Sequence, residues 1–342
     1  MKRAEEIEKI ISASSVITVT AHTHPDGDAI GSGCAMLRYL RLIKGKKAAL
    51  IVPTAIPASL SFIAEEGDAI FSFSDAPQEC QEWIAASDLI ICQDCNSFSR
   101  VTGAEQYLRT SNAKKILIDH HLNPDTESFD LVISKIDISS TSELLYWTLK
   151  EMSDVEGDLK KLPQSCLDAL MTGMTTDTNN FANSVFPSTL TMASELLAAG
   201  VDRDKILNCI YNNYRENRLR LMGFMLHDKM TIMANGVSYM ILDKSTQERY
   251  GFEDGESEGF VNMPLALAKV NVSMFLTEED TKFRVSIRSK RGFSANSFAM
   301  KYFNGGGHEQ AAGGSLYFGK DISSPEEAES YIIKSSKEYF AE

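Results

Sequence analysis

The chain has 342 residues, of which 43% are hydrophobic and 24% are charged. At roughly 100–200 residues per domain this length predicts two domains, and the composition excludes a disordered or low-complexity protein. The 34 Lys and Arg residues against 47 Asp and Glu residues give a net charge of −13. Because most of the surface should repel polyanions, we expect no binding of long duplex nucleic acid.

The N-terminal segment places Glu5, Glu6 and Glu8 where a secretory signal peptide needs an apolar core. Elsewhere no run of about 18 residues is apolar enough for a transmembrane helix. We therefore expect a cytoplasmic protein without a membrane partner. The six cysteines are scattered through the chain, which is typical of reduced core thiols, and we interpret Cys92 and Cys95, the only close pair, in the same way.

The first half of the chain alternates short apolar runs with helical patterns, which predicts a parallel sheet in an αβα arrangement. The expected strands are residues 15–21, 48–52, 88–93 and 115–118. The expected helices are residues 30–43 and 142–152. Because the carboxyl ends of parallel strands gather along one edge, polar residues directly after the strands should meet in one crevice.

The second half predicts a smaller α/β domain after a helical linker. A helical pattern spans about residues 188–226 and contains the polar segment 211–220. After it we expect strands at residues 237–242, 270–275 and 283–287, and a helix at residues 295–302 that ends in the glycine run Gly305, Gly306 and Gly307. We expect the domains to be residues 1–190 and 229–342, joined by the linker 191–228, with an active-site cleft between them.

Aspartate and histidine residues cluster where elements of the first half end. The clusters are, in chain order, His22, Asp26 and Asp28 in the turn after the first strand, then Asp94, then Asp119, His120 and His121, and finally Asp177 in the segment 172–179 after a helix. A single Pro-Asp-Gly turn is more often a plain β-turn, and a single Asp at a strand end is more often a helix cap. Because four such clusters should converge on one sheet edge, together they indicate a binuclear metal site.

The charges and donor types of these clusters favour one kind of ion. The carboxylates of Asp26, Asp28, Asp94 and Asp177 would balance two divalent cations, and without a cation they would repel one another. A mixed set of Asp and His suits a manganese-like ion better than zinc. We expect two Mn²⁺ ions per chain, which Mg²⁺ or Co²⁺ could replace.

A basic segment in the second half predicts an anion site. From Lys282 to His308 the sequence contains six Lys and Arg residues and no acidic residue. The glycine run Gly305–Gly307 lets backbone N–H groups approach a ligand closely, and His308 adds a donor beside them. The alternative is a solvated basic face with a glycine-capped helix. The combination of charge, glycines and histidine favours phosphate or nucleotide binding.

Taken together, these motifs resemble one known family. The strings His22-Thr-His-Pro-Asp-Gly-Asp28, Asp94, Asp119-His120-His121, Asp177 and Gly305-Gly-Gly-His-Glu-Gln-Ala-Ala-Gly313 are similar to those of the DHH phosphoesterase family with its C-terminal DHH-associated domain. The compact two-domain size resembles the branch of oligoribonucleases (nanoRNases) and 3′-phosphoadenosine 5′-phosphate phosphatases. RecJ-type exonucleases share the motifs but resemble longer chains, and family II pyrophosphatases resemble the first half only.

The resemblance implies roles for individual residues. It implies that His22, Asp26 and Asp94 hold one manganese ion. It implies that the other ion is held by Asp28, Asp94, His120 and Asp177, so that Asp94 bridges the two. His121 would face the substrate phosphate, oriented by Asp119. The expected substrate contacts are Arg100, His121, Arg288, Ser289, Gly305, Gly306, Gly307 and His308. His24 departs from the family pattern and is left open as a phosphate contact, a hydrogen-bond donor behind a ligand, or an exposed side chain.

The resulting hypothesis is a manganese-dependent phosphohydrolase that acts on short nucleotides, namely oligoribonucleotides and 3′-phosphoadenosine 5′-phosphate. A water between two metal ions would be activated as hydroxide, and the ions would neutralise charge on the phosphoryl oxygens. The first alternative is a phosphodiesterase for cyclic or linear dinucleotides such as c-di-AMP and pApA. A RecJ-type single-strand exonuclease and a non-catalytic nucleotide-binding protein are favoured less. A homodimer is a further expectation, and the sequence does not rank the substrates.

Overall fold

A computed structural model describes residues 2–340 of the chain. They form two compact units that divide between Asn213 and Tyr214, which we call the first and second units. The division falls within the segment 191–228 that we expected to be a linker. The two units are described separately.

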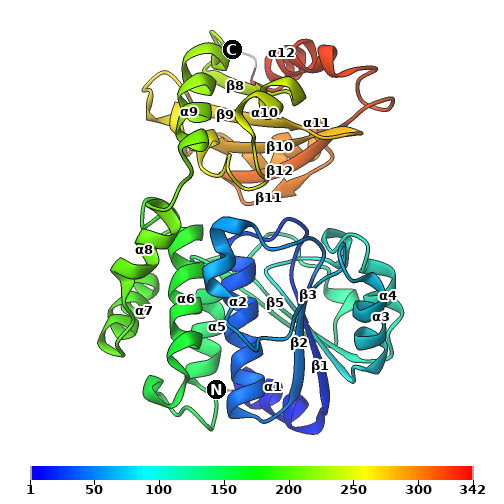
Figure 1. The fold of residues 1–342 in the computed structure, drawn as a ribbon, viewed down its shortest axis with the longest axis vertical. Coiled ribbons are helices and arrows are strands. Elements are labelled where there is room, and N and C mark those ends of the chain that lie inside the picture. The colour runs from blue at the N-terminus through cyan, green and yellow to red at the C-terminus, as the bar shows by residue number, and fades with distance from the viewer. Residues whose placement is uncertain (1, 341–342) are drawn as a thin grey trace. The chain divides into compact units, whose positions relative to one another are not determined.

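The first unit contains a six-stranded parallel sheet in the order β3-β2-β1-β4-β5-β6 (Figure 1). Its strands are β1 (Val16–Thr20), β2 (Lys47–Val52), β3 (Ile70–Ser72), β4 (Leu89–Gln93), β5 (Lys114–Asp119) and β6 (Leu131–Ser134). In the register, Val19 of β1 lies opposite Leu50 of β2 on one side and Ile91 of β4 on the other. Since the chain runs outward from β1 to β3 and then returns to β4, the strand order reverses between β1 and β4. Crevices at such reversal points are the usual binding sites of parallel sheets.

Helices cover both faces of this sheet, as expected for the αβα arrangement. The larger apolar core lies against α1 (Lys2–Ala13), α2 (Gly27–Arg38), α5 (Thr141–Lys150), α6 (Gln164–Asp177), α7 (Pro187–Ala198) and α8 (Arg203–Tyr211). The other face packs against α3 (Pro77–Ala86) and α4 (Glu105–Thr110). Consecutive residues of β4 alternate between the cores, with Ile91 in the first and Ile90 and Cys92 in the second. Strand β4 therefore consists almost entirely of apolar residues, as strands buried on both faces do.

Two glycines bring α2 and α6 into close contact. A β-carbon at Gly31 would lie 2.6 Å from the carbonyl oxygen of Ala169 and 2.9 Å from the Cα atom of Gly173. A β-carbon at Gly173 would lie 2.8 Å from Oδ1 of Asp28, closer than real side chains approach. The absence of a side chain at both positions thus lets the start of α2 pack against the end of α6.

The expected helical stretch 188–226 is in fact three helices, which corrects the prediction of one continuous segment. It contains α7, α8 and α9 (Glu216–Phe224). Gly200, with φ +98°, follows the end of α7. Asp202 then accepts the N–H of Lys205 at 2.9 Å and starts α8. A glycine in the left-handed region and an N-cap are both helix boundaries that apolar spacing alone does not reveal.

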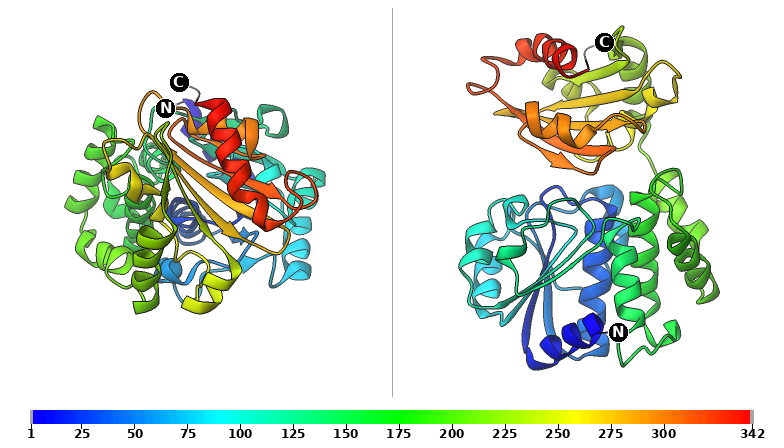
Figure 2. Two further views of the ribbon diagram at one scale, coloured as in Figure 1. Left: turned by 90° about the horizontal axis from the view of Figure 1, so that it is seen from above. Right: turned by 180° about the vertical axis from the view of Figure 1, so that it is seen from behind.

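The second unit is a mixed sheet in the order β11-β12-β10-β9-β8-β7. Its strands are β7 (Thr231–Ile232), β8 (Val237–Leu242), β9 (Val272–Glu278), β10 (Lys282–Ser289), β11 (Gly306–Gly307) and β12 (Ala311–Tyr317). Its remaining α-helices are α10 (Lys244–Tyr250), α11 (Ala295–Tyr302) and α12 (Ala328–Tyr339). Helices α11 and α12 pack on one face of the sheet, and α9 packs on the other. Figure 2 shows α12, in red, lying across the strands.

The glycine run differs from its prediction as a helix terminus. Helix α11 ends at Tyr302, and Gly306 and Gly307 form the short strand β11, which pairs with β12. A β-carbon at Gly305 would lie 1.9 Å from the carbonyl oxygen of Gly313, so this glycine is required by packing within the second unit itself.

Two further expectations concern thiols and membranes. All six cysteines are free thiols, and five of them, including Cys92 and Cys95, are buried. Within residues 2–340, no helix combines the length and the apolar character needed to cross a membrane.

Candidate metal centre

His22 and Asp26 lie in the turn between β1 and α2. The Nδ1 atom of His22 lies 3.0 Å from the carbonyl oxygen of Thr23, so Nδ1 carries a proton and Nε2 is the nitrogen that a cation would use. Asp26 caps α2, since its Oδ1 accepts the N–H groups of Asp28 and Ala29 at 3.0 and 3.1 Å. Its other oxygen, Oδ2, lies 3.8 Å from Nε2 of His22. One carboxylate thus holds the helix start and also offers an oxygen to the site.

Asp94 follows β4 directly and divides its two oxygens between two groups of ligand atoms. Its φ of +51° is in the left-handed region, which Asp tolerates better than most residues. Oδ2 lies 3.4 Å from Nε2 of His22, whereas Oδ1 lies 3.5 Å from Nε2 of His120. This is the arrangement that a carboxylate bridging two cations requires.

The second group of ligand atoms comes from three elements. Nε2 of His120, in the turn after β5, lies 3.8 Å from Oδ2 of Asp28 at the start of α2. The same nitrogen lies 3.4 Å from Oδ2 of Asp177. Asp177 is the last residue of α6, so the segment 172–179 does not follow a helix, as we expected, but largely belongs to one. Its ligand position therefore depends on the packing of α6 against α2.

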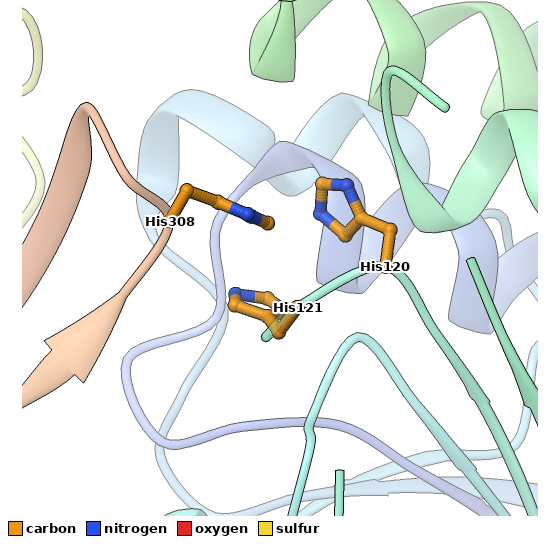
Figure 3. Close-up of side chains that lie close together, drawn as sticks. All are labelled: His120, His121 and His308. Carbon is orange, nitrogen blue, oxygen red and sulfur yellow. The ribbon is translucent and has the colours of Figure 1, made fainter. Parts of the chain in front are cut away.

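His121 is held by Asp119, and its Nδ1 also lies 3.6 Å from Oδ1 of Asp94. Figure 3 shows His120 and His121 adjacent in the turn after β5, and their rings lie edge to face with centroids 4.9 Å apart. Oδ1 of Asp119 lies 2.8 Å from Nδ1 of His121, and Oδ2 accepts the backbone N–H of His121 at 3.1 Å. Asp119 therefore fixes both the backbone and the ring, and leaves Nε2 of His121 as the nitrogen on the far side of the ring.

The pKa values of the cluster show that its carboxylates repel one another. Burial and the charges of Asp94 and Asp177 raise the pKa of Asp28 well above its usual range. Burial alone would lower the pKa of His120, but Asp177 and Asp94 outweigh it and raise this pKa to about 10. Burial would raise the pKa of Asp94, but hydrogen bonds with His120 and His22 lower it well below its usual range. Protons on the imidazoles thus provide the positive charge that cations would otherwise supply.

The donor set fits divalent cations. His22, Asp26 and Asp94 offer ligand atoms within 4.8 Å of one another, and so do Asp28, His120 and Asp177. Imidazole nitrogens together with carboxylate oxygens are ligands that divalent metal ions use in proteins. All six ligands that we predicted from the sequence are therefore brought together.

Sequence reasoning missed the start of α5. The backbone N–H groups of Thr141 and Ser142 donate to Oδ2 and Oδ1 of Asp28 at 2.7 and 2.9 Å. The hydroxyl group of Thr141 also donates to Oδ1 of Asp94, at 3.2 Å. A signal was present, because Ser140 followed by Glu143 is the pattern of a capped helix start.

Arg100 and His24 lie beside the site in the first unit. The carbonyl oxygen of Arg100 accepts both the N–H and the hydroxyl group of Thr23 at 2.8 Å, which ties its turn to that of His22. Burial and the charge of Arg100 lower the pKa of His121. His24 has φ +53°, and its N–H donates to the hydroxyl group of Thr54 at 2.9 Å. A substrate contact by Arg100 stays a prediction, and the role of His24 stays open.

The predicted substrate residues of the second unit lie on β10 and in the β11–β12 hairpin. Arg288 is partly exposed, and its Nη1 donates to the carbonyl oxygen of Ile287 at 3.0 Å. Ser289 is buried and donates its hydroxyl to the carbonyl oxygen of Phe293 at 2.6 Å, so its proton is engaged within the unit. His308 follows β11, and its N–H donates to Ala311. Their contact with a substrate stays a prediction.

Two basic side chains of the segment 282–308 have acidic partners in the structure. Arg284 pairs with Asp254 at 2.6 Å and with Glu279 at 3.3 Å. Lys282 also lies near Glu279, at 3.7 Å. These acidic residues come before Lys282 in the chain, which is why the segment seemed uniformly positive. Among the residues that the structure describes, Arg288 pairs with no acidic side chain.

The fold and the clustered ligands define a DHH phosphoesterase, and comparison with known families agrees. The model of the DHH family N-terminal domain matches residues 16–174, and that of the DHHA1 domain matches residues 236–341. The chain belongs to the DHH phosphoesterase family.

Relatives match this chain along nearly its whole length. The bifunctional oligoribonuclease and PAP phosphatase NrnA of Bacillus subtilis is 31% identical, over 91% of this chain and 93% of its own. The NrnA of Thermus thermophilus, of the same description, is 29% identical over 92% of this chain and 88% of its own. The crystal structure of an exopolyphosphatase-related protein from Bacteroides fragilis superposes with a TM-score of 0.88 at 33% identity, and covers 99% of this chain and 96% of that one.

Proposed function

We propose that this chain is a manganese-dependent hydrolase of phosphoester bonds in short nucleotides, with oligoribonucleotides of a few residues and 3′-phosphoadenosine 5′-phosphate as substrates. The observation that carries the proposal is the position of Asp94, whose two oxygens face two separate sets of His and Asp ligand atoms. The substrate class is supported by the names of the two NrnA relatives.

In this proposal the ligand residues hold the ions as the geometry pairs them. His22 and Asp26 serve one ion, Asp28, His120 and Asp177 serve the other, and Asp94 serves both. Bound ions supply an activated water and neutralise charge on the phosphoryl oxygens. The chain therefore needs no side-chain nucleophile.

His121 is the residue of the first unit that would meet the reacting phosphate. Because Asp119 engages Nδ1, we assign to Nε2 of His121 the exchange of a proton or a hydrogen bond with the substrate. Burial and Arg100 lower the pKa of His121, which favours the neutral ring near pH 7. A neutral ring with a protonated Nδ1 accepts a hydrogen bond at Nε2, and it donates one after it takes up a proton.

The second unit would recognise a part of the substrate that does not react. Arg288 carries a charge that no described acidic side chain pairs, and His308 lies in a hairpin whose glycines expose the backbone. A remote phosphate held there would help to position the reacting one.

The test is a substrate panel with product masses. Purified protein with Mn²⁺ is incubated with RNA of two to about five nucleotides, 3′-phosphoadenosine 5′-phosphate, cyclic di-AMP, pyrophosphate and polyphosphate, with a chelated sample as the control. We expect mononucleotides from RNA, and AMP with phosphate from the bisphosphate, only when the ion is present. Fastest turnover of the cyclic dinucleotide, pyrophosphate or polyphosphate would overturn the substrate assignment, and tight nucleotide binding without turnover would overturn the enzyme itself.

A further inference from the structure

The start of α5 contacts the metal centre without supplying a ligand. Thr141 and Ser142 are completely buried, and their N–H groups donate to the two oxygens of Asp28. Each oxygen of Asp28 keeps a further lone pair for a cation, because a carboxylate oxygen has two. The backbone of α5 therefore fixes the plane of this carboxylate through two hydrogen bonds.

Thr141 is distinctive because it contacts two carboxylates of the site with different groups. Its N–H donates to Oδ2 of Asp28 at 2.7 Å, and its hydroxyl group donates to Oδ1 of Asp94 at 3.2 Å. These two oxygens also lie 3.8 and 3.5 Å from Nε2 of His120. One residue thus holds two carboxylate oxygens on the His120 side of the centre.

The position of Thr141 is itself firmly held. Ser140 caps α5 by accepting the N–H of Glu143 at 3.0 Å. The buried Glu143 carboxylate accepts the N–H of Ser139 at 3.0 Å and the hydroxyl group of Thr189, on α7, at 2.7 Å. The turn before Thr141 is therefore tied to two helices, so that its hydroxyl group has little freedom to turn elsewhere.

We propose that Thr141 is a positioning residue for the cation held by Asp28, Asp94, His120 and Asp177. Its hydroxyl group donates to Oδ1 of Asp94 and would leave the other lone pair of that oxygen for the cation, while its N–H donates to Oδ2 of Asp28. The cation held by His22, Asp26 and Oδ2 of Asp94 does not depend on this contact. The inference rests on the proposed function, since it concerns the same metal centre.

The test compares the variants Thr141→Val and Thr148→Val by Mn²⁺ titration calorimetry of the chelator-treated full chain. Valine at 141 retains the volume and the N–H but removes the hydroxyl group. Thr148, also on α5, donates its hydroxyl group to the carbonyl oxygen of Leu144 at 2.8 Å and provides the matched control. Loss of a hydrogen bond behind a metal ligand typically costs about 10- to 100-fold in metal affinity. We expect this loss in only one of two binding steps for Thr141→Val, none for Thr148→Val, and recovery in Thr141→Ser.

The outcomes separate this inference from the proposed function. Two unchanged steps in Thr141→Val, or an equal loss in both steps, would overturn the positioning role. A wild-type chain that binds no Mn²⁺ would instead overturn the proposed function. Circular dichroism and the melting temperature in chelator report folding of each variant. Should Thr141→Val fold poorly, Thr141→Ala gives the same comparison, because it too keeps the N–H that Asp28 accepts.

Discussion

The polar residues of the two candidate sites differ in their burial and in their hydrogen bonds. In the first unit, the candidate ligand residues lie in the turns after β1, β4 and β5 and on α2 and α6, and most of them are buried; Asp28 is also oriented by hydrogen bonds from α5. In the second unit, the predicted substrate residues are partly exposed, or, like Ser289, already bonded within the unit. Such buried charge is stable only with cations or protons as partners, whereas Arg288 is partly exposed and donates to a backbone carbonyl oxygen.

This difference shows where physical reasoning is strongest. A metal centre requires several groups at once, so its residues can be checked against one another by distance and charge. A phosphate contact requires only one basic side chain without an acidic partner. Such a side chain is easily misjudged from the sequence, because Asp254 and Glu279 neutralise part of the basic segment. The predictions below test this division of roles, beginning with the largest effect.

Removing the bridging carboxylate should have the largest effect. Asp94→Asn is expected to lower turnover by about 1,000-fold or more, since both cations lose a shared negative ligand. Elemental analysis should find less manganese per chain than in the wild type. Asp75→Asn, an exposed substitution in the same unit, is the control. Full manganese content with retained activity in Asp94→Asn would rule out the bridge.

Removing the Arg288 or His308 side chain of the second unit should lower activity on nucleotides alone. Arg288→Ala and His308→Ala are each expected to retain manganese but to lose about 1.5–3 kcal/mol of transition-state stabilisation, the scale of a charged hydrogen bond. The loss should disappear with bis(p-nitrophenyl) phosphate, which has no second phosphate. Arg284→Ala, on the same strand but paired with Asp254, is the control and should change kcat/KM little. Equal losses on both substrates would contradict the division between units.

Manganese affinity should rise with pH in the first unit. The pKa of His120 is raised to about 10, and that of His22 well above its usual range, so both imidazoles carry protons at neutral pH without the cation. Binding must displace these protons, so the affinity should increase by about tenfold per pH unit for each proton released, until the pH approaches the raised values. Calorimetry in buffers of different ionisation enthalpy counts the protons. A pH-independent affinity between about pH 7 and pH 9 would show that the imidazoles are neutral beforehand.

Salt should have the smallest effect. Because the proposed function gives the second unit one remote phosphate to hold, a short RNA should lose affinity with a slope no steeper than about −1.4 in log K against log salt, the value for two phosphates of a single strand. KM for a trinucleotide between about 50 and 200 mM KCl measures this slope. A steeper slope, or rates that increase with RNA length up to about thirty nucleotides, would favour the RecJ-type alternative.

The inner strands of the first sheet were predicted from the sequence better than the strands farther out in the two sheets. Strands β1, β4 and β5 are apolar because both faces are buried, and the Asp and His residues after them stand out for the same reason. The strands β3, β6 and β12 and the two-residue strands β7 and β11 were missed. β3 and β6 are short, and β12 contains Gly313 and Gly314, so none shows a long β-rich pattern.

Contacts between distant parts of the chain were the least predictable. Thr141 donates to an aspartate 113 positions away, and its backbone N–H gives no signal in residue type. Similarly, the acidic partners of Arg284 lie outside the basic segment that drew attention to it. Residue type reveals which groups can bind a metal, whereas packing decides which groups hold them in place.

The close packing of α2 against α6 also affects how inactive homologues of this enzyme should be recognised. A β-carbon at Gly173 would lie 2.0 Å from the hydroxyl oxygen of Ser142 and 2.8 Å from Oδ1 of Asp28. A larger residue there would push Asp28 off its bonds to α5 while leaving every metal ligand unchanged in the sequence. A homologue could therefore lose this activity through a substitution at Gly173, which has no side chain to take part in metal binding. A survey that judges homologues by their ligands should also ask whether this position has remained glycine.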